Sequence, residues 1–306
     1  MSWGHTYVSI TGGAGEGEIP LTGFSGRHWP GIFMQAGATG LDMPAYEVNY
    51  DTSPNLDGST FRSARAAARE IMIPVFLYGI DRYTVRQLKR KLIRTLNPDN
   101  GPCTLRVQES GQPPRYLTCY YKGGLEGNEG ENNAGFRWAS YGIQLTAPDP
   151  YYYGDDFHVA RWAFGGGQPL LGDPGPLFPL KLSAGVVSDS ALPVLNPGDA
   201  RAWPVWEIKG PVRSFTLSHG DRSFGITGPG PGSGEVVPGG RTLRIDTRPG
   251  VKTVRDDLGR NLWPALDPNP DLWALPSGSS RIGVQLVPGS GSAALTMTIK
   301  PRYESY

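Results

Sequence analysis

The stretch DRYTVRQLKRKLIRTL, residues 81–96, carries the clearest secondary-structure signal in the chain. Its apolar residues recur at helical spacing and form one stripe: Val85, Leu88, Leu92 and Leu96. The rest of its surface is almost entirely cationic. Asp81 or Thr84 can cap the start, and Pro98 ends the helix because proline cannot continue it. The sequence therefore predicts one amphipathic helix, with nothing nearby that indicates a catalytic centre.

The strand signals on either side of this helix predict a β-rich domain. Residues 71–79 are continuously apolar, as expected of a strand. Because Pro74 cannot donate a hydrogen bond to a neighbouring strand, we expect an edge or bulged strand there. Residues 136–145 form a further strand, and Pro148 and Pro150 end the domain.

The only cysteines, Cys103 and Cys119, lie in two alternating runs, 103–107 and 116–121, which predict a hairpin with one buried face. If its loop is centred near Gly111, residues whose numbers sum to 222 face each other, so Cys103 lies opposite Cys119. A cross-strand disulfide is geometrically conceivable. Two reduced, half-buried thiols are favoured because we expect synthesis in a cytoplasm.

The first 68 residues are irregular, and two segments there bear on function. Residues 44–58 predict a long arm or loop, a type of segment that is often ordered only by a partner. Residues 62–69 are rich in alanine and are compatible with a helical turn, although they lack good capping residues.

Length and composition indicate two domains built mainly of short strands. The 306 residues include 43 Gly, 29 Pro and 32 aromatic residues, which fits many strands between Gly/Pro turns. We expect an α+β domain over residues 1–163, a linker over 164–176, and an all-β sandwich of jelly-roll character over 177–306. The fold class is mainly β with a short α element.

The charge balance excludes some function classes. A formal net charge of +1 gives no global attraction for nucleic acid or anionic lipid. No run approaches 18 apolar residues, and the first residues show neither a basic leader nor an apolar segment, so we expect a soluble protein without membrane insertion.

Catalytic, cofactor-binding and metal-ligating residues are not expected. The four histidines are scattered along the chain: His5, His28, His158 and His219. The acidic pairs at 155–156 and 256–257 lie beside turn residues, and neighbours on a strand point to opposite faces. There is no nucleophile elbow and no phosphate-binding loop.

Two sets of side chains leave alternatives open. The cations of the helix can contact phosphates, but a solvated face, or pairing with acids of a neighbouring subunit such as Glu126, Glu129 and Glu131, is favoured because no nucleic-acid motif accompanies them. Four tryptophans of the second half can stack on sugar rings, although core packing is favoured for each: Trp203, Trp206, Trp263 and Trp273.

Short motifs along nearly the whole chain carry a family resemblance. In the first half they are Arg69-Glu70-Ile71, Asp81-Arg82, residues 92–98, Gly101-Pro102 and residues 146–153. In the second half they are residues 196–199, 208–211, 245–247 and 278–303. In this order they resemble the distal tail protein family of siphophages, most closely the versions labelled minor tail proteins in phages of actinobacteria.

The resemblance implies a structural virion protein at the distal end of the phage tail, with no enzymatic activity and no cofactor. In that family an N-terminal belt domain assembles as a hexameric ring, and a galectin-like sandwich lies outside it. The ring joins the tail tube protein to the tail-tip hub, so the implied partners are other copies of the chain, the tube and the hub.

We expect such a ring to close through heterologous contacts, with the arm lying on the next subunit and strand edges pairing between subunits. The candidate inter-subunit contacts are Ile71, Ile73, Val75, Arg86, Arg90 and Arg94. The alternative function is a carbohydrate-binding sandwich for host-surface glycans, for which the four tryptophans are the candidate glycan-facing aromatics. A tail-associated hydrolase would need a clustered catalytic set that the sequence does not show.

Overall fold

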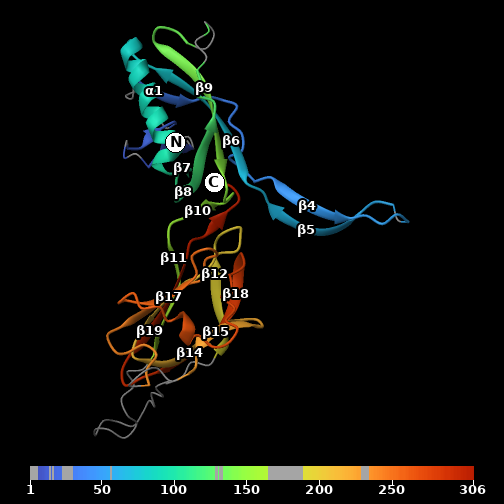
Figure 1. Cartoon of the computed structure of the whole chain (residues 1–306), viewed down its shortest axis with the longest axis vertical. Coiled ribbons are helices and arrows are strands. Elements are labelled where there is room, and N and C mark those ends of the chain that lie inside the picture. The colour runs from blue at the N-terminus through green and yellow to red at the C-terminus, as the bar shows by residue number, and fades with distance from the viewer. Residues whose placement is uncertain are drawn as a thin grey trace. The chain divides into compact units, whose positions relative to one another are not determined.

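The structure, a computed structural model, describes residues 6–13, 15, 17–22, 30–55, 57–127, 130, 134–164, 189–228 and 234–306. The chain divides into two compact units, shown in Figure 1. The first comprises Met1–Asp155 with Tyr303–Tyr306, and the second comprises Asp156–Arg302. Strands dominate both units, which confirms the expected mainly β fold with a short α element.

The first unit is built on one antiparallel sheet. Its main path has the order β2-β1-β7-β8-β9-β6-β3. The strands are β1 (Tyr7–Thr11), β2 (Ile19–Pro20), β3 (Gly31–Met34), β6 (Arg69–Tyr78), β7 (Cys103–Gln108), β8 (Arg115–Gly123) and β9 (Trp138–Ala147). The short β10 (Tyr152–Tyr153) pairs with β8, and the chain re-enters this unit through β20 (Arg302–Tyr303), whose second residue belongs to it.

Strand β6 lies inside the sheet, so the expectation of an edge strand is wrong. It pairs with β9 over its whole length and with β3 over its last four residues. Pro74 is tolerated because the N and O atoms of a strand residue point to the same side. The Pro74 carbonyl accepts from Gln35 N at 2.8 Å, beyond the end of β3, so no ladder hydrogen bond to β9 is lost.

Helix α1 (Arg82–Leu96) begins where the sequence predicts. Asp81 is the cap: its carboxylate accepts from the backbone N–H and the hydroxyl of Thr84, both at 2.7 Å, and these bonds lower the pKa of Asp81. Val85, Leu92 and Leu96 are buried, and Leu88 packs beside them. The apolar stripe therefore holds α1 against β6 and β9, while most of the cationic surface stays outside.

The hairpin of β7 and β8 has the expected register. Cys103 lies opposite Cys119, and Leu105 lies opposite Leu117. Both cysteines are free and buried. Burial raises the pKa of Cys103 to about 11, which keeps its thiol protonated at neutral pH. The pair packs as two small apolar side chains rather than as a disulfide.

The second unit is a sandwich of two antiparallel sheets, with orders β11-β19-β13-β16-β17 and β12-β18-β14-β15. The strands of the first sheet are β11 (Phe157–Phe164), β13 (Val205–Lys209), β16 (Thr242–Asp246), β17 (Thr253–Asp256) and β19 (Ala293–Ile299). Those of the second are β12 (Asp189–Asn196), β14 (Val212–His219), β15 (Arg222–Ile226) and β18 (Gly278–Pro288). The described residues also contain two 3-10 turns, η1 (Pro98–Asn100) in the first unit and η2 (Trp263–Ala265) in the second.

The boundary between the two units differs from the sequence-based expectation. Strand β11 pairs with β19 and so belongs to the second unit, although the expected boundary was residue 163. Strand β12 contains Pro193, which is tolerated since β12 is an edge strand paired with β18 alone. Residues 165–188, with most of the expected linker, lie outside the described residues.

Candidate assembly interface

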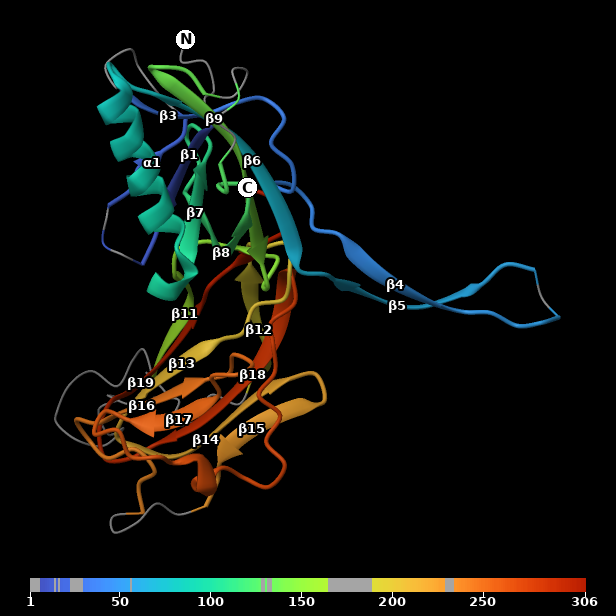
Figure 2. The ribbon, with the colours of Figure 1, turned by 45° about the horizontal axis from the view of Figure 1, so that its top comes forward.

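A two-stranded hairpin, here called the arm, leaves the sheet of the first unit. It consists of β4 (Tyr46–Asp51) and β5 (Thr60–Ala66), which pair with each other and form a sheet of their own. Figure 2 shows it extending from the body of the first unit. The expected arm is therefore a hairpin. The expected helical turn at 62–69 is wrong because those residues continue β5 and enter β6.

One face of the arm is polar and satisfied within the hairpin. Arg65 Nη2 lies 2.6 Å from Glu47 Oε2, and Arg62 forms an ion pair with Asp51. These side chains stay largely exposed to water, so each pair contributes at most about 1 kcal/mol to stability. The polar face makes the arm soluble and helps to fix its register.

The other face of the arm is apolar and exposed. Val48, Tyr50 and Phe61 are 39%, 58% and 60% exposed. Tyr50 lies opposite Phe61, their ring centroids are 6.5 Å apart in an edge-to-face arrangement, and Val48 shares the face of Tyr50 because it is two residues away along β4. A lone two-stranded hairpin is marginally stable in water. An exposed apolar face on such a hairpin is typical of a surface that another protein covers.

A buried arginine holds the root of the arm, the segment where β5 continues into β6. Arg69, 2% exposed, donates from Nε to the carbonyl of Pro150 at 2.8 Å and from Nη2 to that of Glu304 at 2.8 Å. Its Nη1 donates to the carbonyls of Gly40, at 3.1 Å, and Asp42. One guanidinium thus ties the segment before β4 to the segment between β9 and β10 and to residues 303–306. In the sequence this residue stood out only through its place in the family motif.

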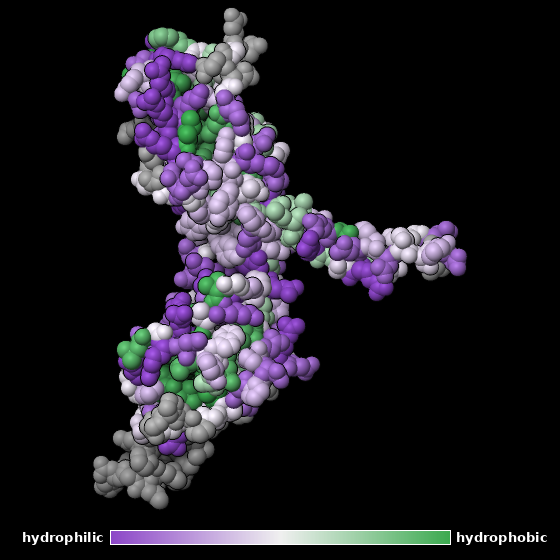
Figure 3. Space-filling view, viewed as in Figure 1, coloured by the Kyte–Doolittle hydropathy of each residue, from purple (hydrophilic) through white to green (hydrophobic). Residues whose placement is uncertain are grey.

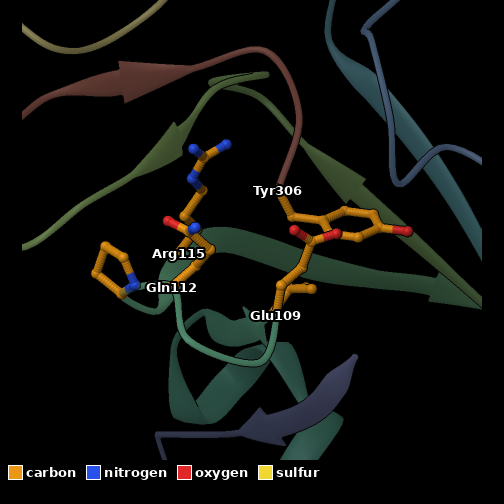
Figure 4. A pocket seen from close by; sticks show the side chains of 6 residues that line it. Glu109, Gln112, Arg115 and Tyr306 are labelled. Atoms are coloured by element: carbon orange, nitrogen blue, oxygen red, sulfur yellow. The ribbon is translucent and has the colours of Figure 1, made fainter. Parts of the chain in front are cut away.

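A shallow pocket nearby anchors residues 303–306. It is lined by Val107, Glu109, Gln112, Pro113, Arg115 and Tyr306, four of which are labelled in Figure 4. The guanidinium carbon of Arg115 lies 3.7 Å from the ring centroid of Tyr303, and Nη1 donates to the carbonyl of Ser305 at 2.5 Å. These contacts fix the returning segment of the chain.

The outer surface of α1 is strongly cationic, and hydrophilic residues follow it in Figure 3. Arg86, Arg90 and Arg94 are exposed, and their role as inter-subunit contacts stays a prediction. Ile71, Ile73 and Val75 are at most 1% exposed and form the core of the first unit. Their proposed role as ring contacts is wrong, because β6 is covered on both sides by other strands.

The candidate acidic partners of this surface are only partly described. Glu126 is exposed, and its carboxylate accepts from Gly124 N at 2.8 and 3.0 Å. Glu129 and Glu131 lie outside the described residues.

The four tryptophans of the second unit do not form a common exposed face. Trp206 and Trp273 are 0% and 1% exposed, and their ring centroids lie 5.7 Å apart in the sandwich core, so neither faces a glycan. Trp203 lies under the guanidinium of Arg302, at 4.9 Å. Trp263 is 36% exposed.

The described part of the chain gives no support for other chemistry. Within it, no three His, Cys, Asp or Glu side chains are grouped to hold a metal ion. His5 and His28 lie outside the described residues. The described helices include none that is long and apolar enough to cross a membrane.

A segment of the first unit is similar to a known protein family. Residues 32–136, which include the arm, α1 and the β7–β8 hairpin, match the family described as phage tail protein RIFT-related domain. The match covers 105 of the 306 residues, about a third of the chain. No curated protein matches the sequence.

Solved structures extend the likeness beyond this segment. The Dit protein (gp 19.1) of phage SPP1, described as a paradigm of hub adsorption apparatus in Gram-positive infecting phages, has a TM-score of 0.59 at 15% identity, over 88% of this chain and 93% of that chain. Chains from the phage P2 baseplate in its activated conformation, with Ca and with Sr, have TM-scores of 0.51 and 0.50 at 10% identity, over 99% of this chain and 100% of theirs. They confirm the resemblance to the siphophage distal tail family at the level of the fold.

Proposed function

We propose that this chain is a structural, non-enzymatic virion protein, a distal tail connector that forms a closed ring of six copies. The ring joins the tail tube protein to the tail-tip hub at the distal end of the tail, after synthesis in the host cytoplasm. The segment that matches the phage tail family and the fold shared with the Dit and baseplate chains support this assignment.

The arm is the observation that carries the proposal. It exposes the apolar face of Val48, Tyr50 and Phe61 on a hairpin that cannot bury that face by itself. If the arm lies on the next subunit, every copy both offers one arm and receives one. Such a heterologous contact closes into a ring when the rotation between copies is a whole fraction of a turn.

The alternative, a glycan-binding sandwich, has less support. Two of its four candidate aromatics are core residues, and a third lies under an arginine. A platform for a sugar needs several exposed aromatic rings on one face, and Trp263 alone does not supply it.

The experiment is to replace the apolar face of the arm and to measure the mass of the assembly by light scattering. We expect Tyr50→Ser with Phe61→Ser to shift the protein from ring to monomer, because the covered apolar area is lost. Thermal unfolding of the body should stay unchanged, since both rings are exposed in the single chain.

The matched control is Asn49→Ala with Ser63→Ala, a change on the polar face of the same hairpin, where Asn49 Nδ2 donates to Ser63 Oγ at 3.2 Å. This control should keep the ring. A double serine variant that assembles as well as the wild type would contradict the role of the arm.

A further inference from the structure

A cationic pocket lies between α1 and β9 in the first unit. It is lined by Arg82, Val85, Arg86, Lys89, Ala139 and Tyr141. The three cations are four and then three residues apart, so they project from one side of the helix. The Lys89 ammonium lies 5.2 Å from the ring centroid of Tyr141, and Arg82 Nη1 donates to the carbonyl of Gly135 at 2.9 Å. The pocket thus combines positive charge with an apolar and aromatic floor.

The charge distribution makes another copy of this chain a suitable partner for this cationic surface. Helix α1 holds six of the 29 Lys and Arg residues and none of the 28 Asp and Glu residues. The rest of the chain therefore has 23 cations against 28 acids, a net charge of −5. The positively charged surface of α1 attracts the negatively charged remainder of a second copy, which favours contacts between copies.

The arm carries one acid that is suited to this pocket. Glu47 and Asp51 are already paired with Arg65 and Arg62 within the hairpin. Asp57, at the tip, is exposed and forms no ion pair with any residue that the structure describes. Asp57 is therefore the arm acid whose charge a second molecule can neutralise without breaking an existing pair.

Apolar side chains beside the pocket match the apolar face of the arm. Ile80, Tyr83 and Phe136 are 64%, 68% and 71% exposed. The backbone bond from Gly79 N to the carbonyl of Arg137, 2.9 Å long, brings the two segments that carry them together. The arm thus offers an acid and an apolar face, and the surface around α1 offers cations and exposed apolar side chains.

Within the first unit, both ribbon views place α1 and the arm on opposite sides of the sheet (Figures 1 and 2). Complementary surfaces on opposite sides of one body produce a head-to-tail contact. We propose that the arm of one subunit docks beside α1 of the next, with the Asp57 carboxylate in the pocket of Arg82, Arg86 and Lys89. The apolar face of the arm then covers Ile80, Tyr83 and Phe136. This inference rests on the proposed function and names the receiving surface of the ring contact.

A charge-swap series tests the contact. The variants are Arg86→Glu, Asp57→Arg, the two combined in one chain, and Arg90→Glu as the matched control. Arg90 is an exposed arginine on the same helix that does not line the pocket. The protein concentration at half-assembly is measured by light scattering at low and at high salt, and thermal unfolding confirms that each variant is folded.

We expect each single reversal at Arg86 or Asp57 to raise the concentration at half-assembly by about tenfold or more at low salt, and high salt to reduce the effect. The combined variant should assemble better than Asp57→Arg alone, because the new carboxylate attracts the new guanidinium, while Arg82 and Lys89 keep the recovery partial. Arg90→Glu should stay close to the wild type.

Other outcomes overturn the inference in distinguishable ways. If Arg86→Glu and Arg90→Glu weaken assembly equally, or if the combined variant assembles no better than Asp57→Arg alone, the Asp57 contact is contradicted while the ring stands. The Asp57 contact is also contradicted, while the ring stands, if all variants assemble like the wild type. If the wild type stays monomeric under all conditions, the proposed function fails, and this inference fails with it.

Discussion

Arg69 shows how one side chain can organise the region from which the arm leaves. A guanidinium buried without partners would cost several kcal/mol. Here four carbonyl oxygens accept from it, and its carbon lies 5.0 Å from the ring centroid of Tyr152. Those carbonyls belong to three separate segments of the first unit, so the same bonds that offset the burial cost also fix the root of the arm.

We expect Arg69→Ala to lower the free energy of unfolding by about 3–5 kcal/mol, because it leaves a void and several buried carbonyls without donors. Arg69→Lys should recover only part of this free energy. One ammonium group cannot reach all the carbonyl oxygens that the planar guanidinium of Arg69 contacts. Urea denaturation measures both. Arg62→Ala, which removes an exposed pair on the arm, is the comparison and should cost no more than about 1 kcal/mol. If Arg69→Ala and Arg62→Ala lower the free energy of unfolding equally, this role of Arg69 is contradicted.

At the scale of elements, α1 was predictable because its signals are local. The cap at Asp81, the apolar stripe and the stop at Pro98 lie within 18 residues, and the structure contains each of them. The β7–β8 register was equally predictable, since a hairpin pairs neighbours along the chain. These elements required no knowledge of distant contacts.

The position of β6 and the exposure of the arm depend on contacts far apart in sequence. Pro74 is compatible with an inner strand only because β3 ends beside it, which no feature of residues 71–79 reveals. Alternation such as Tyr46, Val48 and Tyr50 looks the same in a half-buried strand and in an arm that meets no other sheet. The sequence therefore indicated an arm without indicating its apolar face.

Two adjacent residues of α1 test how the helix is held. Leu92 is 0% exposed and Ile93 is 43% exposed. We expect Leu92→Ala to lower the free energy of unfolding by about 2–5 kcal/mol, because it leaves a cavity against the sheet. Ile93→Ala should cost less than about 1 kcal/mol. Chemical denaturation measures the free energy of unfolding of both variants. If Ile93→Ala lowers it as much as Leu92→Ala, the helix packs by another face.

At the scale of the whole molecule, the surfaces proposed for assembly lie in the first unit. The first unit carries the segment that matches the phage tail family, the arm and the cationic face of α1, and the proposed ring uses the last two as its contact surfaces. The second unit keeps Trp206 and Trp273 inside its sandwich. The proposed ring therefore depends on the first unit, and on a contact in which each copy both offers an arm and receives one.

The most direct test of this account is the mass of the purified wild-type protein in solution by light scattering. Six copies of the 33.0 kDa chain weigh 198 kDa, and we expect that mass for a closed ring, independent of concentration above the assembly threshold. A mass of 33.0 kDa that persists at every concentration and salt would contradict the ring, and with it the role of the arm as an inter-subunit contact.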